Sequence, residues 1–470
     1  TPPSAPSTAG IFDLSSSFAG DRDWATSSTS LSASWSIGTD TVSGIKDYDV
    51  CFSSFNNGCV QIAGTTTQAG NTTLTATATA TGLAAGSTYY TCVRANDNAG
   101  NTSDWSCSDG FALDTAAPTN PTSADIFDLT TTGADIDWTN DTVSLAARWN
   151  AGVDPISGVR DYDVCFSTVS TGCSAIPGTG MLSANTARTV TATAAGMTGG
   201  STYYTCVRTW DNAGNNAGWS CSDGFTIDVA APPALSTSDI ADLSITMTDA
   251  DWSNSATSLS ASWNAGTDPD SGVRDYSVCF STSGSTCSNI SGTTTITGNT
   301  TRTASATATS MTSGTTYYTC IRVVDVAGNS SAWKCSDGFT VDSVAPVNPN
   351  QANIFDLSTS LVDVDWTTST TTLSASWNTG SDAASGIRDY DVCFSTTSND
   401  CTNIAGTTTQ SANTTRTATA TATGMTSGTT YYTCIRSNDI AGNTATWTCS
   451  DGFTVDTGVP SNPAQSGIHD

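Results

Sequence analysis

The sequence predicts an all-β protein built from four tandem sandwich domains, and two observations lead to this prediction. First, the 470-residue chain carries 42 acidic and 14 basic side chains; every acidic residue is Asp, and Lys46 and Lys334 are its only lysines. Glu and Lys are good helix formers, whereas the Thr, Ser, Val and Tyr that remain, with 40 Gly and 14 Pro, favour strands and turns. Second, the sequence repeats four times at a spacing of 114 residues.

The repeat is clearest in the Trp and Cys residues. One Trp recurs at the same place as Trp35, Trp149, Trp263 and Trp377, and all 16 cysteines fall into one pattern, four to a repeat. A period of this length suits an independent domain with its own core. The predicted domains are 1–115, 116–229, 230–343 and 344–457, followed by a linker and the start of a fifth repeat at 458–470. Because Ile468-His469-Asp470 matches the start of the fourth repeat, we expect the sequence to be a segment of a longer array.

Alternating residues predict the strands of the first repeat in order. Apolar and polar side chains alternate over residues 31–35 and 48–52, Ala alternates with Thr over residues 75–80, and residues 89–94 alternate again. A period of two is typical of a strand with one buried face. Several short strands separated by turn residues are typical of a two-sheet sandwich, and four sandwiches in tandem predict an elongated rod.

These segments resemble fibronectin type III domains. The resemblance rests on Leu31–Trp35 with its strand-B Trp, on Gly44–Val50, on Gly82–Tyr89 with its strand-F Tyr, and on Val93–Ala95. It covers all four repeats and is closest to tandem fibronectin type III-like repeats of microbial extracellular and surface proteins. The resemblance implies an immunoglobulin-like sandwich and a role in spacing, adhesion or partner display, with no catalytic activity. The four cysteines per repeat depart from the family pattern.

The cysteines predict disulfides and an extracellular or cell-surface location, because such bonds persist in oxidising compartments. If Ala99–Gly100 forms the tip of a hairpin, Cys92 faces Cys107, which leaves Cys51 to pair with Cys59. A bond between Cys51 and Cys92 is the competing possibility. A zinc site is disfavoured because no CxxC spacing and no His occur within a repeat. The equivalent pairs are Cys165 with Cys173, Cys206 with Cys221, Cys279 with Cys287, Cys320 with Cys335, Cys393 with Cys401, and Cys434 with Cys449.

The same hairpin places Arg94 opposite Trp105 on the face away from the core. A guanidinium over an exposed indole contributes about 0.5 to 1 kcal/mol, so the pair is either local support for the hairpin or a contact strip for a neighbouring subunit or a sugar. Extending this register would turn Phe111 outward, so we expect a bulge near Asp109–Gly110. The pair recurs as Arg208 with Trp219, Arg322 with Trp333, and Arg436 with Trp447.

Asp residues recur near the predicted domain boundaries, in the first strand and just before the Pro-containing linkers, with a DxDW run such as Asp21 to Trp24 between them. Calcium takes about six to eight oxygen ligands, so carboxylates gathered at a joint could bind it and stiffen the joint. The alternative is Asp held locally in turns and caps, since no EF-hand or glycine-rich nonapeptide loop is present. The candidate calcium ligands are Asp13, Asp114, Asp128, Asp228, Asp242, Asp342, Asp356 and Asp456.

Asn-X-Ser/Thr triplets are candidate glycosylation sites, although such triplets also arise by chance in a Thr-rich chain. Glycans there could cover sheet edges and prevent unwanted pairing. The candidate residues are Asn71, Asn101, Asn140, Asn289, Asn299, Asn329 and Asn413.

Composition also limits the function. The net charge of −28 would repel nucleic acid, and no segment is apolar enough to predict a membrane span. Because the only histidine is His469, we expect no nucleophilic triad, no enzymatic activity and no cofactor other than calcium. The leading hypothesis is a structural extracellular protein, a repeat segment of a cell-surface filament or stalk whose partners are copies of itself. The alternative is an adhesin that binds glycans, host surfaces or other cells through the Arg/Trp strip. A third possibility is a spacer within a secreted hydrolase.

Overall fold

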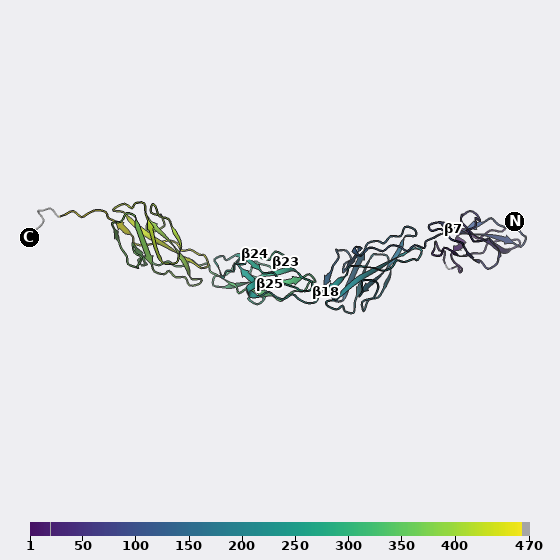
Figure 1. The fold of residues 1–470 in the computed structure, drawn as a ribbon, viewed down its shortest axis with the longest axis horizontal. Coiled ribbons are helices and arrows are strands. Elements are labelled where there is room, and N and C mark those ends of the chain that lie inside the picture. The colour runs from purple at the N-terminus through teal and green to yellow at the C-terminus, as the bar shows by residue number, and fades with distance from the viewer. Residues whose placement is uncertain (19, 463–470) are drawn as a thin grey trace, which may run out of the picture. The chain divides into compact units, whose positions relative to one another are not determined.

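The computed structural model describes residues 1–18 and 20–462. Strands and four single-turn 3-10 helices make up the regular structure, so the all-β prediction is confirmed. Four sandwiches follow one another along the chain (Figure 1). The predicted start of a fifth repeat at Ile468 and the single His469 lie outside the described residues. Over the part of the chain that is described, no helix has the length and apolar character needed to cross a membrane.

Every repeat has the same order of elements. In the first repeat they are η1 (Thr8–Gly10), β1 (Ile11–Asp13), β2 (Trp24–Ala25), β3 (Ser30–Trp35), β4 (Ile45–Ser53), β5 (Gln68–Asn71), β6 (Thr75–Thr79), β7 (Thr88–Asp97), β8 (Ser106–Cys107) and β9 (Phe111–Leu113). In the second repeat they are η2 (Ser123–Asp125), β10 (Ile126–Asp128), β11 (Trp138–Thr139), β12 (Ser144–Trp149), β13 (Val159–Ser167), β14 (Leu182–Asn185), β15 (Thr189–Thr193), β16 (Thr202–Asp211), β17 (Ser220–Cys221) and β18 (Phe225–Ile227).

The third and fourth repeats follow the same plan. The third contains η3 (Thr237–Asp239), β19 (Ile240–Asp242), β20 (Trp252–Ser253), β21 (Ser258–Trp263), β22 (Val273–Ser281), β23 (Ile296–Asn299), β24 (Thr303–Thr307), β25 (Thr316–Asp325), β26 (Lys334–Cys335) and β27 (Phe339–Val341). The fourth contains η4 (Gln351–Asn353), β28 (Ile354–Asp356), β29 (Trp366–Thr367), β30 (Thr372–Trp377), β31 (Ile387–Ser395), β32 (Gln410–Asn413), β33 (Thr417–Thr421), β34 (Thr430–Asp439), β35 (Thr448–Cys449) and β36 (Phe453–Val455).

Two sheets form each sandwich. In the first repeat one sheet has the order β1-β3-β6, and the other has the order β2-β9-β7-β4-β5, with β8 also paired to β7. All pairs are antiparallel except β2 with β9, which run parallel. The first strand β1 and the last strand β9 therefore belong to different sheets, which separates the residues that end them.

The core lies between the two sheets, where alternating side chains turn inward. Trp35 of β3 is fully buried and its ring meets that of Tyr48 of β4 edge to face, with the ring centroids 5.9 Å apart. The Tyr48 hydroxyl accepts a hydrogen bond from the Gly38 N–H at 2.9 Å, and the Tyr89 hydroxyl accepts one from the Ala84 N–H at 2.9 Å. The two tyrosines thus have satisfied hydroxyls, whereas Trp35 Nε1 has no hydrogen-bond partner among the described residues.

The chain changes register between β8 and β9, as the sequence predicts. Cys92 lies opposite Cys107, whereas Tyr89 lies opposite Phe111, so the strand facing β7 has one additional residue there. Gly110 takes a φ of 101°, and Phe111 is buried with 1% of its surface exposed. Toward the tip the register differs from the prediction, because Asn96 bridges to Thr102 rather than Ser103. A tight turn with a positive φ at Gly100 accommodates that shift.

Candidate functional site

Disulfides reinforce the outer face of the larger sheet. In the first repeat Cys51 is bonded to Cys59 and Cys92 to Cys107, the pairing favoured by the hairpin argument. Cys51 and Cys92 lie opposite each other on β4 and β7 but are not bonded to each other. The other bonds join Cys165 to Cys173, Cys206 to Cys221, Cys279 to Cys287, Cys320 to Cys335, Cys393 to Cys401, and Cys434 to Cys449.

The Arg/Trp strip lies on this disulfide face. The Arg94 guanidinium carbon lies 4.7 Å from the ring centroid of Trp105, and the Arg94 Nε lies 2.9 Å from a carboxylate oxygen of Asp49. Trp105 is partly buried against the cysteines of its own repeat. Both side chains are therefore engaged within the repeat, which agrees with hairpin support. The equivalent distances are 4.9 Å for Arg208 and Trp219, 5.1 Å for Arg322 and Trp333, and 4.8 Å for Arg436 and Trp447.

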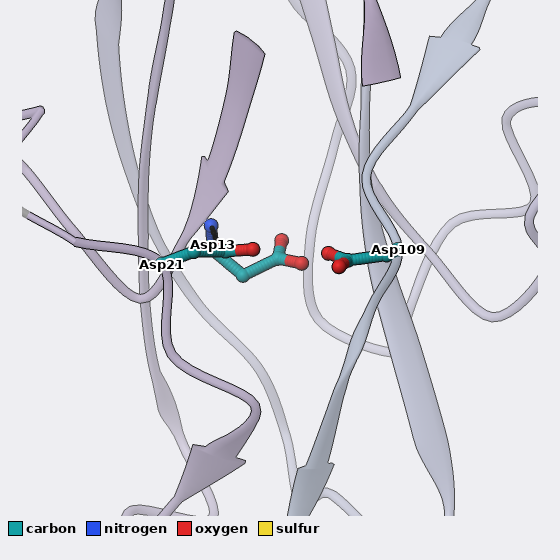
Figure 2. A group of neighbouring side chains, drawn as sticks. All are labelled: Asp13, Asp21 and Asp109. Carbon is teal, nitrogen blue, oxygen red and sulfur yellow. Dashed lines mark hydrogen bonds between the residues drawn. The ribbon is translucent and has the colours of Figure 1, made fainter. Parts of the chain in front are cut away.

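Three carboxylates of the first repeat lie close together, that of Asp13 buried and those of Asp21 and Asp109 exposed. Asp13 ends β1, Asp21 lies in the loop between β1 and β2, and Asp109 lies in the loop between β8 and β9. An oxygen from each lies within 4.8 Å of the others. Figure 2 shows the Asp13 and Asp109 side chains directed toward one another, with Asp21 beside Asp13. We call this group and its counterparts in the later repeats the sandwich cluster.

Burial controls the electrostatics of the sandwich cluster. Asp13 has no exposed surface, and burial raises its pKa to about 7, although the nearby hydroxyls of Ser108 and Thr91 oppose this rise. The Thr91 hydroxyl donates to Asp13 Oδ1 at 2.6 Å, whereas Oδ2 has no hydrogen-bond partner among the described residues. Burial, followed by the neighbouring Asp109, also raises the pKa of Asp21. Ionising these carboxylates in the folded repeat therefore costs free energy.

The sandwich cluster recurs in every repeat. Burial raises the pKa of Asp128 to about 7 and of both Asp242 and Asp356 to about 6. Each has an Oδ2 with no hydrogen-bond partner among the described residues, as Asp13 does. The carboxylates nearby are Asp135 and Asp223 in the second repeat, Asp249 and Asp337 in the third, and Asp363 and Asp451 in the fourth.

The predicted calcium set divides into two groups, which corrects the expectation that all eight residues gather at the domain boundaries. Asp13 and its counterparts Asp128, Asp242 and Asp356 lie inside their own sandwiches. Asp114 and its counterparts follow the last strand of each repeat. The separation arises because β1 and β9 belong to different sheets.

Asp114 joins the first repeat to the second. Its N–H donates to the Ala25 carbonyl of the first repeat at 2.9 Å, and its carbonyl accepts from Asn215 Nδ2 of the second repeat at 3.0 Å. Its Oδ2 accepts from the Ser157 N–H at 3.2 Å. Oxygens of Asp114, Asp154 and Asp211 lie within 4.8 Å of one another, and we call these three residues the junction cluster.

The linker after Asp114 is bonded to the second repeat. Thr119 and Val153 form an antiparallel bridge, with N–H to carbonyl distances of 2.8 and 3.1 Å. Asn120 Oδ1 accepts from the Thr209 N–H at 2.8 Å, and Asn120 Nδ2 donates to the Gly218 carbonyl. The linker is therefore held by hydrogen bonds along one edge of the second repeat.

The same joint occurs between the third and fourth repeats. Asp342 donates its N–H to the Ser253 carbonyl at 2.8 Å, and its carbonyl accepts from Asn443 Nδ2 at 2.7 Å. Burial alone would raise the pKa of Asp342, but hydrogen bonds from Ser385 and the Val344 N–H outweigh it and lower the pKa. The predicted residues Asp228 and Asp456 end their own repeats by donating to the carbonyls of Thr139 and Thr367.

Most candidate glycosylation residues hold turns. Asn71 Nδ2 donates to the Thr75 carbonyl at 2.8 Å, and Asn299 and Asn413 make the equivalent bond at the same distance. Asn101 and Asn329 donate instead to aspartates, at 2.7 and 2.8 Å. Asn289 Nδ2 lies 3.3 Å from the Thr295 hydroxyl, and Asn140 is exposed. Glycosylation at these residues stays a prediction.

Asp109 is not among the metal ligands predicted from the sequence, and Asp21 is predicted only as part of the DxDW run. A signal for Asp109 was present, because Ser108-Asp109-Gly110 recurs in every repeat as a Ser-Asp-Gly triplet. The positive φ at the register change explains the Gly of this triplet but not its Asp. In the sequence analysis this triplet predicts only a β-bulge.

Comparisons with known proteins address the fold. The family model for the fibronectin type III domain matches residues 246–334, within the third repeat. Exoglucanase B of Cellulomonas fimi is 28% identical over 355 residues, covering 74% of this chain and 26% of the relative. Endoglucanase B of Cellulomonas fimi is 26% identical over 319 residues, covering 67% of this chain and 26% of the relative. This chain therefore spans about a quarter of the length of these relatives.

A solved structure was also compared. The chicken CNTN1 FN1-FN3 domains are 16% identical and match 73% of this chain and 100% of that chain, with a TM-score of 0.28, which is too low to carry an argument. The assignment rests instead on the matched third repeat and on the element order and strand pairing that the other three share with it. The chain is a tandem array of fibronectin type III-like β-sandwich repeats, each with two internal disulfides.

Proposed function

We propose that this segment is a structural spacer of an extracellular stalk or filament, in which hydrogen bonds at the joints limit bending between neighbouring repeats. One observation carries the proposal. Asp114 is bonded through its backbone to both the first and the second repeat, and the linker that follows is paired to the second. A linker held in this way has lost most of its freedom, unlike a flexible Gly/Ser linker.

The disulfides support an extracellular setting, because such bonds persist in oxidising compartments. They also limit how far an unfolded repeat could extend, since the segments between bonded cysteines cannot be drawn out. The relatives named as glucanases, of which this chain spans about a quarter, support a role beside a further module as well as a role in a stalk. The absence of catalytic activity in this segment stays a prediction.

The adhesin alternative is less well supported. It requires Arg94 and Trp105 to be available to a ligand, yet Arg94 is paired with Asp49 and Trp105 packs beside the disulfides. Binding on a glycan array that is lost on Trp105→Ala, with the fold intact, would support the adhesin instead.

The spacer proposal is tested by the spread of angles between neighbouring repeats, measured in electron micrographs of single chains. Asn215→Ala with Asn443→Ala removes the bonds to the carbonyls of Asp114 and Asp342 and should widen the spread at those two joints. Asn101→Ala is the matched control, because Asn101 makes the same local bonds to Asp97 but has no joint before it in this chain. An equal spread in wild type and the double variant would contradict the proposal. Images of native material would then separate a filament of many chains from a single-chain stalk.

A further inference from the structure

The sandwich cluster has more negative charge than its surroundings neutralise. Asp13, Asp21 and Asp109 bring three carboxylates within 4.8 Å, and Lys and Arg make no ion pair with any of them among the described residues (Figure 2). Asp13 is withdrawn from water while Asp21 and Asp109 are exposed, and the repulsion therefore acts most strongly on Asp13. A cation from solution would offset this repulsion at Asp13.

The second observation is an unpartnered oxygen aimed into the cluster. Asp13 has no exposed surface, its Oδ1 accepts from Thr91, and its Oδ2 has no partner in the described chain. Leaving a buried carboxylate oxygen without a partner costs free energy, and such groups in proteins are usually hydrogen-bonded or coordinate a cation. The Asp13 side chain points toward Asp109 (Figure 2), so Oδ2 lies on the side where the other carboxylates gather.

A buried aspartate with an unpartnered oxygen and two acidic neighbours recurs at all four positions, which an accident of one loop would not produce. Asp128, Asp242 and Asp356 are each fully buried with an unpartnered Oδ2. In each case the backbone N–H of that residue donates to a second Asp of the same cluster, at 2.5 Å in the second repeat, 2.7 Å in the third and 2.8 Å in the fourth. The second carboxylate is thereby held beside the first.

We infer that each sandwich cluster binds one hard divalent cation of the calcium class, held by three aspartates of a single repeat. Carboxylate oxygens are the ligands that calcium prefers, whereas zinc and copper sites use nitrogen and sulfur ligands that these clusters lack. Water would complete the coordination shell. The three ligands are Asp13, Asp21 and Asp109 in the first repeat, and Asp242, Asp249 and Asp337 in the third. In the second and fourth repeats the proposed ligands are the buried aspartate and its charged neighbours, Asp128 with Asp135 and Asp223, and Asp356 with Asp363 and Asp451.

Such an ion would fasten the two sheets of a sandwich together. Asp13 belongs to β1 of the three-stranded sheet, and Asp109 lies between β8 and β9 of the larger sheet. No disulfide joins these two sheets in the first repeat, because all four cysteines lie on the larger sheet or its loops. The ion would supply the missing link, and this inference does not depend on the proposed spacer function.

The competing account is that protons neutralise the clusters. Binding is therefore measured at about pH 8, where carboxylic acids of this kind are ionised. Equilibrium dialysis of the full chain against about 1 mM Ca²⁺, a concentration suited to extracellular calcium modules, counts the bound ions. Asp109→Asn with Asp337→Asn should lose two ions relative to wild type. The charge-matched control, Asp104→Asn with Asp400→Asn, changes two exposed aspartates and should lose none.

Thermal unfolding is a second test, because the difference in unfolding temperature between variant and wild type should change sign when Ca²⁺ replaces chelator. In chelator the double variant Asp109→Asn with Asp337→Asn should unfold at a higher temperature than wild type, because two repelling charges are gone. In Ca²⁺ the order should reverse, because wild type gains two more bound ions. A wild-type chain that binds no Ca²⁺, or a double variant that binds as many ions as wild type, would overturn the inference. An unfolding temperature that Ca²⁺ leaves unchanged in both chains would overturn it as well.

Discussion

The sandwich cluster and the junction cluster each contain three aspartates within 4.8 Å, but their carboxylates have different surroundings. In the junction cluster, Asp211 Oδ1 accepts from the N–H groups of Gly214 and Asn215, both at 2.7 Å, and its Oδ2 accepts from Asn215 Nδ2. In the sandwich cluster, Asp13 has one hydroxyl partner for its two oxygens. Backbone N–H groups stabilise the charged form of a carboxylate, whereas neighbouring carboxylates destabilise it.

The comparison shows that the stability of a buried carboxylate's charge depends on the hydrogen-bond donors around it rather than on its place in the sequence. Asp114 and Asp211 are as fully buried as Asp13, yet both accept hydrogen bonds from backbone N–H groups of nearby turns. Asp114 and Asp211 thus make ordinary turn and joint contacts, whereas Asp154 Oδ2 has no hydrogen-bond partner among the described residues. Removing a charge should therefore have opposite effects in the two clusters.

The largest expected effect is in the junction cluster. Asp211→Ala would remove the acceptor of three part-buried hydrogen bonds, from the Gly214 and Asn215 N–H groups and from Asn215 Nδ2, and should destabilise the second repeat by about 3 kcal/mol. Hydrogen exchange of peptides from that repeat measures the loss. Asp211→Asn keeps an acceptor oxygen and should lose less. If the alanine variant were as stable as wild type, the account of this cluster as a set of required acceptors would be wrong.

The next effect has the opposite sign. With divalent ions chelated at about pH 8, Asp128→Asn should stabilise the second repeat by about 1 to 2 kcal/mol, because the neutral amide is not repelled by Asp135 and Asp223. The same exchange measurement in chelator tests this. A loss of stability comparable with that of Asp211→Ala would remove the distinction between the clusters.

A smaller change sharpens the account of the sandwich cluster. Thr91→Val removes the hydroxyl that donates to Asp13 Oδ1 and should destabilise the first repeat by about 1 kcal/mol in chelator. Valine has nearly the shape of threonine, so packing should be preserved. Thr79→Val, on the exposed side of β6, is the control and should change little. Equal effects of the two changes would show that the hydroxyl of Thr91 has no special role.

The smallest expected effect comes from adding a carboxylate next to an arginine that lacks an acidic partner. Asp49 pairs with Arg94, but the third repeat has Ser277 at the equivalent place, and Arg322 Nε has no partner there among the described residues. Ser277→Asp should stabilise the third repeat by about 0.5 kcal/mol, a gain reduced by added salt. Ser277→Asn offers an oxygen without charge and serves as the comparison. A gain that is independent of salt would argue against an ion pair.

Much of the fold could be predicted from the sequence because its signals are local. Alternation over residues 31–35 shows which side chains turn inward, and the expected two-residue turn at Ala99–Gly100 placed Cys92 opposite Cys107, as in the structure. The register change at Gly110 followed from the need to bury Phe111. The shift that pairs Asn96 with Thr102 was missed, because one residue of slip near a turn leaves no trace in the pattern of apolar residues.

The candidate sites could be predicted only in part. The recurrence of Asp13 and Asp114 marked both as unusual, but their partners come from distant segments: Asp109 for the first, and Asp154 with Asp211 for the second. Nothing in the sequence near Asp13 indicates that residue 109 will lie beside it. The assignment of both residues to one boundary site failed for this reason.

The sequence by itself determined the strands and the four repeats, because both depend on periodicity, and a short hairpin favoured the disulfide pairs that the structure shows. Only the tertiary structure decided which carboxylates share a site. The packing of two sheets brings Asp13 and Asp109 together, and the pairing of a linker with the next repeat brings Asp114 to Asp211. Burial and hydrogen-bond donors then decide whether each charge is stabilised, and both are properties of the packed chain rather than of its residues one by one.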